Sequence, residues 1–483
     1  MRKKVDLAPD AHISMGEKIA DCFAGTETGA IQIFIASFIM VYFTNVVKVD
    51  PAIAAGIIAV SKIFDGITDI IMGYIIDHTY SKHGKARYWI ITGSVPAAIS
   101  LVLAFFMPAG LHGFAQIVYL FLTYNLLTIV GLTVLGVAKG ALDGYITINQ
   151  KDRGIIGGMY MLFSVIISIV LQSSVLQLCS KFGGGNVYSP NGWLAMTIIY
   201  AIIFTICSLI GVHFVHERVT ITEIEQVLKL KDTGAKLTKN KEKTPFLVTL
   251  KALIKNKYWV IFIIAMLMVV LNNSLGSTTI YFTQYVLGDV MLYTPISNVC
   301  TLAMLIGVAF SFIGMTKFKK KIIVLTGMGA MVIGLILPMF SLNMTMLYVG
   351  AVLRGIGTGL AGCVLPSMLQ DTLTYGHWKN GFDMIGMGNA AFSFSQKIGG
   401  SLGTLLLGAV LKMGRFNVDL TTQTQFTKAM LTASFTWIPA ILIAIALLSI
   451  LQYDLDYKYD QVVADLKEGK YAMKGEDSSF HKE

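Results

Sequence analysis

Twelve long apolar runs constrain the fold of this chain more than any other feature. A helix needs about 20 apolar residues to cross the ~30 Å hydrocarbon core of a bilayer. Runs of that length lie at 16–47, 51–77, 88–108, 114–147, 155–179, 193–215, 258–287, 292–316, 321–341, 344–373, 383–413 and 425–452. Only 14% of the 483 residues are charged, whereas a soluble protein carries about a quarter. The sequence therefore predicts an all-α integral membrane protein with twelve transmembrane helices.

The polar segments between these runs predict how the chain divides. We expect an N-terminal six-helix half at 1–215, a basic linker at 216–257, a C-terminal six-helix half at 258–453 and a charged tail at 454–483. Each half has a lysine-rich turn between its second and third runs, near 78–88 and 314–321. Parallel repeats of six helices, related by an axis along the membrane normal, are a known transporter architecture. The pattern favours a transporter whose solute site lies between the two halves.

The basic residues indicate orientation in the membrane and not a nucleic-acid partner. The formal net charge is +10, but the lysines and arginines gather in alternate connections between apolar runs, such as the segment from Arg218 to Lys257. Positively charged loops stay in the cytoplasm. The sequence therefore predicts a multi-pass protein of the plasma membrane with both termini cytoplasmic. We expect such a protein to have the lipid bilayer and a small-molecule substrate as its partners. The sequence indicates no obligate protein partner.

The sequence carries no pattern typical of an enzyme. It has no HExxH pair and no P-loop, which are the motifs of zinc proteases and nucleotide-binding proteins. Its five cysteines are odd in number and have no paired or metal-type spacing, so they indicate neither a disulfide framework nor a zinc site. We expect a protein that is not an enzyme and has no cofactor apart from a coupling ion.

Charged residues inside the second run indicate an ion site. An Asp, Lys or Arg at the centre of a transmembrane helix costs about 2.5–3.5 kcal/mol on insertion scales. Lys62, Asp65 and Asp69 lie three and four residues apart, which makes them neighbours on a helix. Two carboxylates at this spacing repel each other, so that one takes a proton or a cation binds between them. The alternative is a structural ion-pair network with Lys62 and a second lysine, and the two interpretations are compatible.

Other polar residues inside the runs are candidates for substrate binding. Lys139 and Asp143 are four residues apart, and a structural ion pair is the favoured interpretation. Arg354 falls near mid-membrane, and Lys397 precedes the glycines of IGGSLG. Neither has a charged partner nearby in the sequence, so we expect functional roles for both. The full set of substrate-binding candidates is Glu27, Lys139, Asp143, Asn272, Asn273 and Arg354. The two asparagines fit hydrogen bonding to a polyol or between helices equally well.

One segment carries a specific family resemblance. The sequence FDGITDIIMGYIIDHTYSKHGKARYW, which starts at Phe64, resembles the glycoside–pentoside–hexuronide:cation symporters of the major facilitator superfamily. Weaker matches follow in the same order, with YFTNVV at Tyr42, YFTQYVLGD at Tyr281, TYGHWKNG at Thr374 and SQKIGGSLG at Ser395. The resemblance implies the major facilitator fold and secondary symport of a sugar, glycoside or uronide with Na⁺ or H⁺ by alternating access.

The resemblance also implies roles for individual residues. Asp65 and Asp69 match the family's paired aspartates that bind the coupling Na⁺, H⁺ or Li⁺. Thr68 matches a residue that helps to select the cation, and Thr133 matches a threonine that completes the site. Lys397 matches a lysine near the paired acids, where it would serve as their charge partner. If the coupling ion is sodium, Asp65 and Asp69 are its expected metal ligands.

The sugar-binding positions of that family are not kept in this chain. Gly29, Gly136 and Met161 stand where the family has carboxylates or amides and an arginine, whereas Lys139 and Arg354 are gained. We therefore expect that the substrate is anionic in part, such as an acidic glycoside. The alternative substrate is a non-sugar organic anion or a lipid-like solute. The alternative for Arg354 is a permanent ion pair with Glu27, Asp143 or Asp383.

Overall fold

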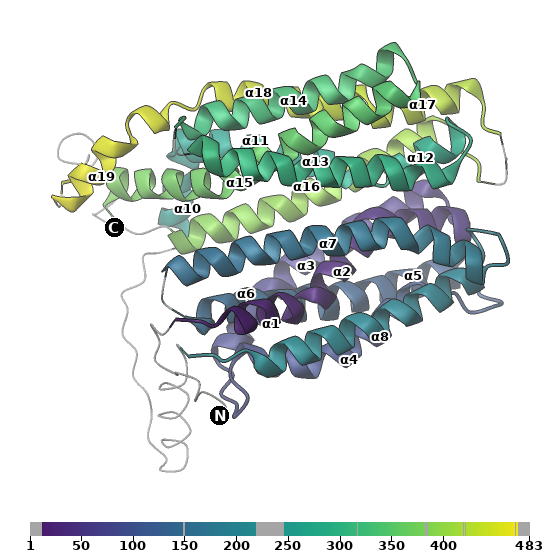
Figure 1. The fold of residues 1–483 in the computed structure, drawn as a ribbon, viewed down its shortest axis with the longest axis horizontal. Coiled ribbons are helices and arrows are strands. Elements are labelled where there is room, and N and C mark those ends of the chain that lie inside the picture. The colour runs from purple at the N-terminus through teal and green to yellow at the C-terminus, as the bar shows by residue number, and fades with distance from the viewer. Residues whose placement is uncertain are drawn as a thin grey trace. The chain divides into compact units, whose positions relative to one another are not determined.

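The computed structural model describes residues 12–147, 150–218, 246–315, 317–381, 385–418, 420, 422–468 and 470–471. The described chain is helical (Figure 1). It divides into two compact units, Met1–Thr238 with Asn417–Thr421 and Lys239–Phe416 with Thr422–Glu483. Within the described residues, ten helical stretches are long and apolar enough to cross a membrane. Helices cover all twelve expected runs, and the two runs outside this set of ten, α3 and α16, carry Asp65, Asp69 and Lys397.

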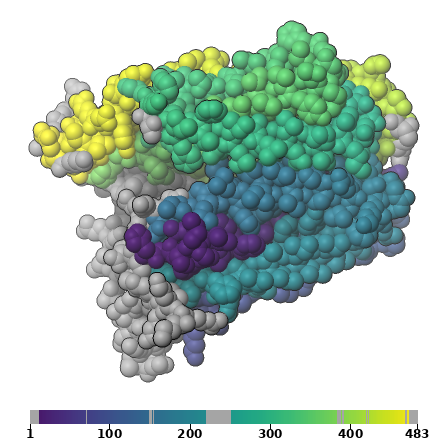
Figure 2. Space-filling view, viewed as in Figure 1, coloured from purple at the N-terminus to yellow at the C-terminus, as the bar shows by residue number. Residues whose placement is uncertain are grey.

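The first unit contains the helices of the N-terminal half. They are α1 (Met15–Ala24), α2 (Thr26–Phe34), the π-helical segments η1 (Ile35–Ile39) and η2 (Tyr42–Val46), α3 (Pro51–Asp77), α4 (Ala86–Ala104), α5 (Phe114–Leu127), the π-helical segment η3 (Thr128–Val134), α6 (Leu135–Ile146), α7 (Gln150–Phe182) and α8 (Pro190–Phe214). The α1 helix lies at the surface between α7 and α8 (Figure 2). Its polar residues bond to Asp152 of α7, Lys139 of α6 and Arg218, which follows α8.

The second unit contains the remaining helices. They are α10 (Phe246–Lys255), α11 (Lys257–Ser274), α12 (Thr278–Tyr285), the 3-10 turn η4 (Val290–Leu292), α13 (Tyr293–Met315), α14 (Lys320–Phe340), α15 (Met344–Asn380), α16 (Ile385–Met413), α17 (Gln425–Phe435), α18 (Trp437–Leu451), the 3-10 turn η5 (Leu455–Tyr457) and α19 (Tyr459–Lys467). The α10 helix lies within 216–257, the segment that the sequence predicts as a linker.

Three of the expected runs are interrupted where the sequence predicts continuous helices. The first run breaks at Gly25, the seventh between α11 and α12, and the twelfth at Thr436. A side chain at position 25 is excluded for a steric reason, since a Cβ atom there would lie 2.4 Å from Cε2 of Tyr160. Only glycine lets the tyrosine ring of α7 approach the first helix this closely. Hydropathy reports run length, and it is insensitive to such local breaks.

The glycines of α15 pack this helix against two neighbours. A Cβ atom would lie 2.1 Å from the Cys300 oxygen at Gly355, 2.3 Å from the Gly327 oxygen at Gly357 and 2.2 Å from the Met304 oxygen at Gly359. No side chain fits at such distances, so the backbone of α15 touches those of α13 and α14. Small residues allow this approach inside membranes, where packing drives helix association. These three glycines therefore serve close helix packing.

An acidic residue that follows the last long helix of each unit binds the start of another helix in that unit. In the first unit, the Glu217 carboxylate accepts hydrogen bonds from the backbone N–H groups of Lys85 at 2.9 Å, Ala86 at 2.9 Å and Arg87 at 2.7 Å, where α4 begins. In the second unit, Asp456 accepts from the N–H of Lys321 at 2.7 Å, where α14 begins. The first N–H groups of a helix lack partners within the helix, so both carboxylates satisfy them.

Two ion pairs hold the first turn of α1, and one of them includes Arg218, the residue after Glu217. Arg218 donates to both carboxylate oxygens of Glu17 at 2.7 Å, and both side chains are buried. Lys18 donates to Asp152 at the start of α7 at 2.6 Å. These contacts, with the cap at Glu217, tie the segment after α8 to α1 and α4.

Candidate functional site

The predicted cation-site residues of the second run lie on one face of α3. Asp50 caps this helix through N–H bonds from Ala52 and Ile53, and Pro51 occupies its first turn. Proline suits this position because the first helical N–H groups need no partner inside the helix. Asp65 is buried with 5% of its surface exposed, and Asp69, one turn further on, is half-buried. The carboxylates therefore face protein and not an open surface.

The π-helical segment η3 supplies the residue that meets this face. Thr133 is buried and donates a hydrogen bond to Oδ1 of Asp69 at 2.8 Å. Its hydroxyl also lies 3.2 Å from that of Thr68, which in turn bonds to the backbone carbonyl of Asp65 at 3.2 Å. The structure thus brings the side chains of Thr68, Asp69 and Thr133 together, and Asp65 joins them through its backbone carbonyl. The π-helix widens the turn here, as π-helices often do at functional sites.

The oxygen atoms of this group suit a hard monovalent cation or a proton. Two carboxylates and two hydroxyls from α3 and η3 offer only oxygen ligands, which hard cations prefer. Lys62, one turn before Asp65, is close enough to interact with its charge. Lys397 lies half-buried on α16 in the second unit, where its carbonyl accepts a bond from Ser401 at 2.9 Å. Its role as a charge partner stays a prediction.

Lys139 and Asp143 form the ion pair that their spacing predicts. Lys139 also donates to Asp21 of α1 at 3.0 Å, so two carboxylates already compensate its charge. This removes one of the two cations on which the expectation of an anionic substrate was based. Asp21 is absent from the candidates predicted from the sequence, although it is a charge inside an apolar run like the others. The same insertion-cost argument finds it.

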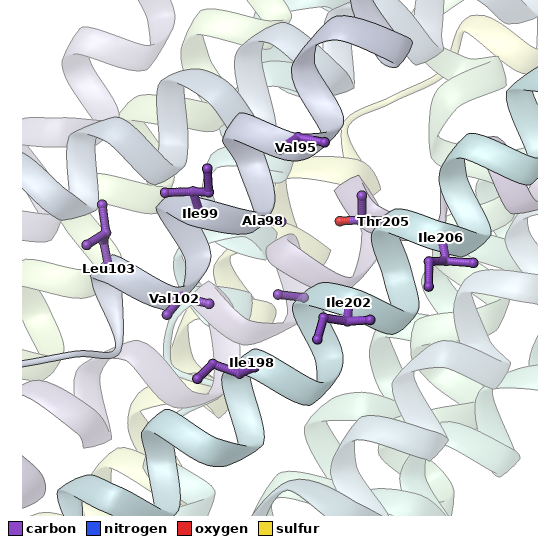
Figure 3. A pocket seen from close by; sticks show the side chains of 10 residues that line it. Val95, Ala98, Ile99, Val102, Leu103, Ile198, Ile202, Thr205 and Ile206 are labelled. Carbon is purple, nitrogen blue, oxygen red and sulfur yellow. The ribbon is translucent and has the colours of Figure 1, made fainter.

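Glu27 is buried inside the first unit. Its carboxylate accepts a hydrogen bond from Thr205 of α8 at 2.8 Å, and 3% of the residue is exposed. Thr205 in turn lines a groove between α4 and α8 (Figure 3). The other groove residues are apolar, and they are Val95, Ala98, Ile99, Val102, Leu103, Ile198, Ala201, Ile202 and Ile206. With a single hydroxyl, which donates to Glu27, this groove suits lipid chains and not a sugar.

The remaining candidates lie in the second unit. Asn272 and Asn273 end α11 just before its break, Asn273 is exposed, and the two amides lie 3.4 Å apart. Arg354 is half-buried on α15, with its guanidinium 5.2 Å from the centre of the Phe435 ring. No ion pair of Arg354 is found among the described residues. Asp383, one of its predicted alternative partners, lies outside the described residues.

Comparison with known proteins assigns a family to this arrangement. A family model described as MFS/sugar transport protein matches residues 23–457. The isoprimeverose transporter of Lactiplantibacillus pentosus is 26% identical over 90% of this chain and 87% of its own length. The glucuronide carrier protein homolog of Escherichia coli is 22% identical over 90% of this chain and 92% of its own length.

Solved structures agree on the fold. The crystal structure of a D-xylose–proton symporter superposes with a TM-score of 0.60, at 15% identity, over 92% of this chain and 97% of its own. The crystal structure of the nucleoside transporter NupG gives a TM-score of 0.58 at 14% identity, over 93% of this chain and 99% of its own. At these identities the likeness shows the helical architecture alone.

Proposed function

Because the chain belongs to the MFS/sugar transport protein family, as a glycoside–pentoside–hexuronide:cation symporter of the major facilitator superfamily, we propose that it imports a sugar or glycoside together with a cation. We assign cation binding to Asp65, Thr68, Asp69 and Thr133. The observation that carries this assignment is the hydrogen bond from Thr133 to Asp69, beside the hydroxyl of Thr68. It joins residues that are 64 positions apart in the chain into one set of oxygen ligands.

A cation at this site acts as a link between α3 and η3. Its charge relieves the repulsion between Asp65 and Asp69, and its oxygen ligands come from both segments. A ligand shifts a conformational equilibrium by as much as its affinities for the two states differ. Cation binding therefore favours the conformation in which α3 and η3 lie close together. This preference is the physical basis that we propose for coupling cation movement to solute movement.

We propose that the substrate is a glycoside. Isoprimeverose and glucuronides, the solutes in the names of two relatives, are both glycosides, the first neutral and the second acidic. Arg354 favours the acidic class, because a half-buried guanidinium with no ion pair among the described residues matches the geometry of a carboxylate. A neutral glycoside is the second candidate. We place the carrier in the plasma membrane with both termini cytoplasmic, and we assign it transport and no catalysis.

Uptake into proteoliposomes tests this proposal. Purified protein is reconstituted and given labelled isoprimeverose or a labelled glucuronide, under an imposed Na⁺ gradient or an imposed H⁺ gradient. We expect one gradient to drive accumulation of at least one sugar. Asp69→Asn removes a charge and a hard ligand, so it should abolish gradient-driven accumulation while leaving exchange of substrate down its own gradient.

Asp50→Asn provides the matched control. It makes the same substitution on the same helix, and asparagine caps a helix as well as aspartate does. We expect wild-type accumulation from this variant. Gradient-driven accumulation by correctly inserted Asp69→Asn protein at the control level would refute the assignment of the cation site.

Competition by matched neutral and acidic glycosides tests the role of Arg354. In the wild type, we expect the acidic compound to compete better for uptake. In Arg354→Gln this advantage should disappear, because the neutral amide lacks the charge that binds the carboxylate. An unchanged ranking in the variant would exclude contact between Arg354 and the acidic group.

A further inference from the structure

A buried charged cluster in the first unit has no part in the proposed cation site. It consists of Asp21 of α1, Lys139 and Asp143 of α6, and Tyr160 of α7. The Lys139 ammonium bonds to Asp21 at 3.0 Å and to Asp143, and it lies 4.7 Å from the centre of the Tyr160 ring. Tyr160 donates from its hydroxyl to the carbonyl of Gly25 at 3.3 Å. Three helices thus converge on one lysine.

The cluster contains more negative than positive charge. Two carboxylates share one ammonium, which leaves one net negative charge in the cluster when both carboxylates are ionised. Burying a charge that is not compensated is expensive, because the protein interior solvates it far less well than water does. The cluster is therefore short of one positive charge.

The two carboxylates differ in how well they are satisfied. The side chain of Asp143 is 39% exposed, so water can reach it. Asp21 is fully buried, and its Oδ1 atom has no hydrogen-bond partner in the described part of the chain. A buried acceptor without a partner loses its hydrogen bonds to water and gains none from the protein, which costs free energy. Asp21 is therefore the carboxylate on which a negative charge is least well compensated.

We propose that Asp21, Lys139 and Asp143 form a proton-binding site separate from the Asp65–Asp69 pair, with Asp21 as the group that takes up the proton. A proton neutralises the excess charge and needs almost no space. A metal ion suits the cluster less well, because the ammonium of Lys139 already lies between the two carboxylates. The partly exposed side chain of Asp143 marks the side from which water can deliver the proton.

Other charged groups near Asp21 are already paired. From α6 and α7 it is faced by Lys139, Asp143 and the phenol of Tyr160, and the thiol of Cys22 follows on α1 itself. One turn earlier on α1, Glu17 is held by Arg218, which follows α8. The described surroundings therefore supply no second cation to Asp21.

The new site shares no residue with the cation site that we propose above. Lys139 follows Thr133 by six residues, which is about 9 Å along a helix. Protonation of Asp21 and cation binding at Asp69 are therefore distinct events on neighbouring segments. The proposal rests on the contacts of Asp21 and stands even if the coupling ion binds elsewhere.

Infrared difference spectroscopy on the purified full-length protein tests the proposal. A buried carboxyl group gives a C=O stretching band that appears on protonation, and titration of this band between pH 5 and pH 9 reports its proton affinity. Because Glu27 and Asp65 are also buried, we expect wild type and Asp69→Asn to share a component of this band that Asp21→Asn lacks. A band of unchanged intensity in Asp21→Asn, or no such band in the wild type, would overturn the proposal.

A second variant keeps the test decisive if Asp21→Asn does not fold. Asp143→Asn leaves one carboxylate and one ammonium, so the excess negative charge is gone. Its proton should bind about tenfold more weakly, which is a shift of about one pH unit. An unshifted titration in Asp143→Asn would contradict the shared-charge argument. Loss of transport coupling in Asp69→Asn with the carboxyl band intact separates this site from the cation site.

Discussion

Removal of the Glu217 carboxylate should loosen the first unit at the start of α4. This side chain accepts three backbone hydrogen bonds and is 3% exposed, so Glu217→Ala leaves three N–H groups of α4 without their acceptor. Loss of a helix cap costs about 0.5–2 kcal/mol, and a buried unsatisfied donor adds about 1–3 kcal/mol. Together these give about 3 kcal/mol. Glu217→Gln keeps one oxygen and loses the charge at the helix N-terminus, for which we expect about 1 kcal/mol.

Two buried cysteines report on this unit. Cys22 is 2% exposed and Cys179 is fully buried, so a thiol-reactive fluorescent dye labels them only as the unit opens on heating. For a unit of about 200 residues, 1 kcal/mol corresponds to about 2–4 °C. We therefore expect Glu217→Ala to melt about 6–12 °C below the wild type.

Glu468→Ala, in the second unit, is the control for the same substitution at an exposed position. Its side chain is 60% exposed and forms a surface ion pair with Lys470, and such pairs contribute about 0–1 kcal/mol. Its melting temperature should stay near that of the wild type. If Glu217→Ala melted within about 4 °C of this control, the range that 0–1 kcal/mol allows, the carboxylate would not stabilise the start of α4.

Three further predictions concern other parts of the molecule. The hydrogen bond from Lys18 lowers the pKa of Asp152 to about 2. The charged form of Asp152 therefore stabilises the protein above pH ~4. The difference in melting temperature between wild type and Asp152→Asn should shrink as pH falls from 4 towards 2. Gly355→Ala should destabilise the protein by about 2 kcal/mol in thermal unfolding, because the added methyl group meets backbone at 2.1 Å, whereas Gly362→Ala on the same helix has open space and should be neutral or stabilising. Lys397→Leu should lower the yield of folded protein or change the pH dependence of Na⁺ binding measured by calorimetry, and unchanged values for both would exclude a role as charge partner.

The sequence predicts the helices well because a bilayer imposes a length and a hydropathy on each one. The second run, predicted at 51–77, is α3 from Pro51 to Asp77. Helix breaks such as the one at Gly25 are not predictable in this way, and neither is the contact of Gly25 with the ring of Tyr160, which comes from a distant part of the chain. Local composition carries no signal for such a contact.

The candidate site also has a part that the sequence predicts and a part that it does not. The spacing of Asp65 and Asp69 puts both on one face of a helix, and this can be read directly from the sequence. The partner Thr133 came only from the family resemblance, because one threonine among many has no distinguishing spacing. Asp21 was missed although its position inside an apolar run is as unusual as that of Asp143. Its partnership with Lys139 depends on packing between α1 and α6, which only the structure shows.

The π-helical segment η3 has a consequence for how the fourth transmembrane run tolerates changes in length. A π turn closes its hydrogen bonds over five residues and an α turn over four, so η3 holds a residue that an α-helix would not need. Deletion of one residue within 128–134 can convert the π turn to an α turn and leave α6 facing as before. The same deletion in a regular helix such as α8 rotates every later side chain by about 100°. Natural length variation by one residue that spares Thr133 should therefore keep the following helix in register in this stretch of the chain, and should not do so in its straight helices.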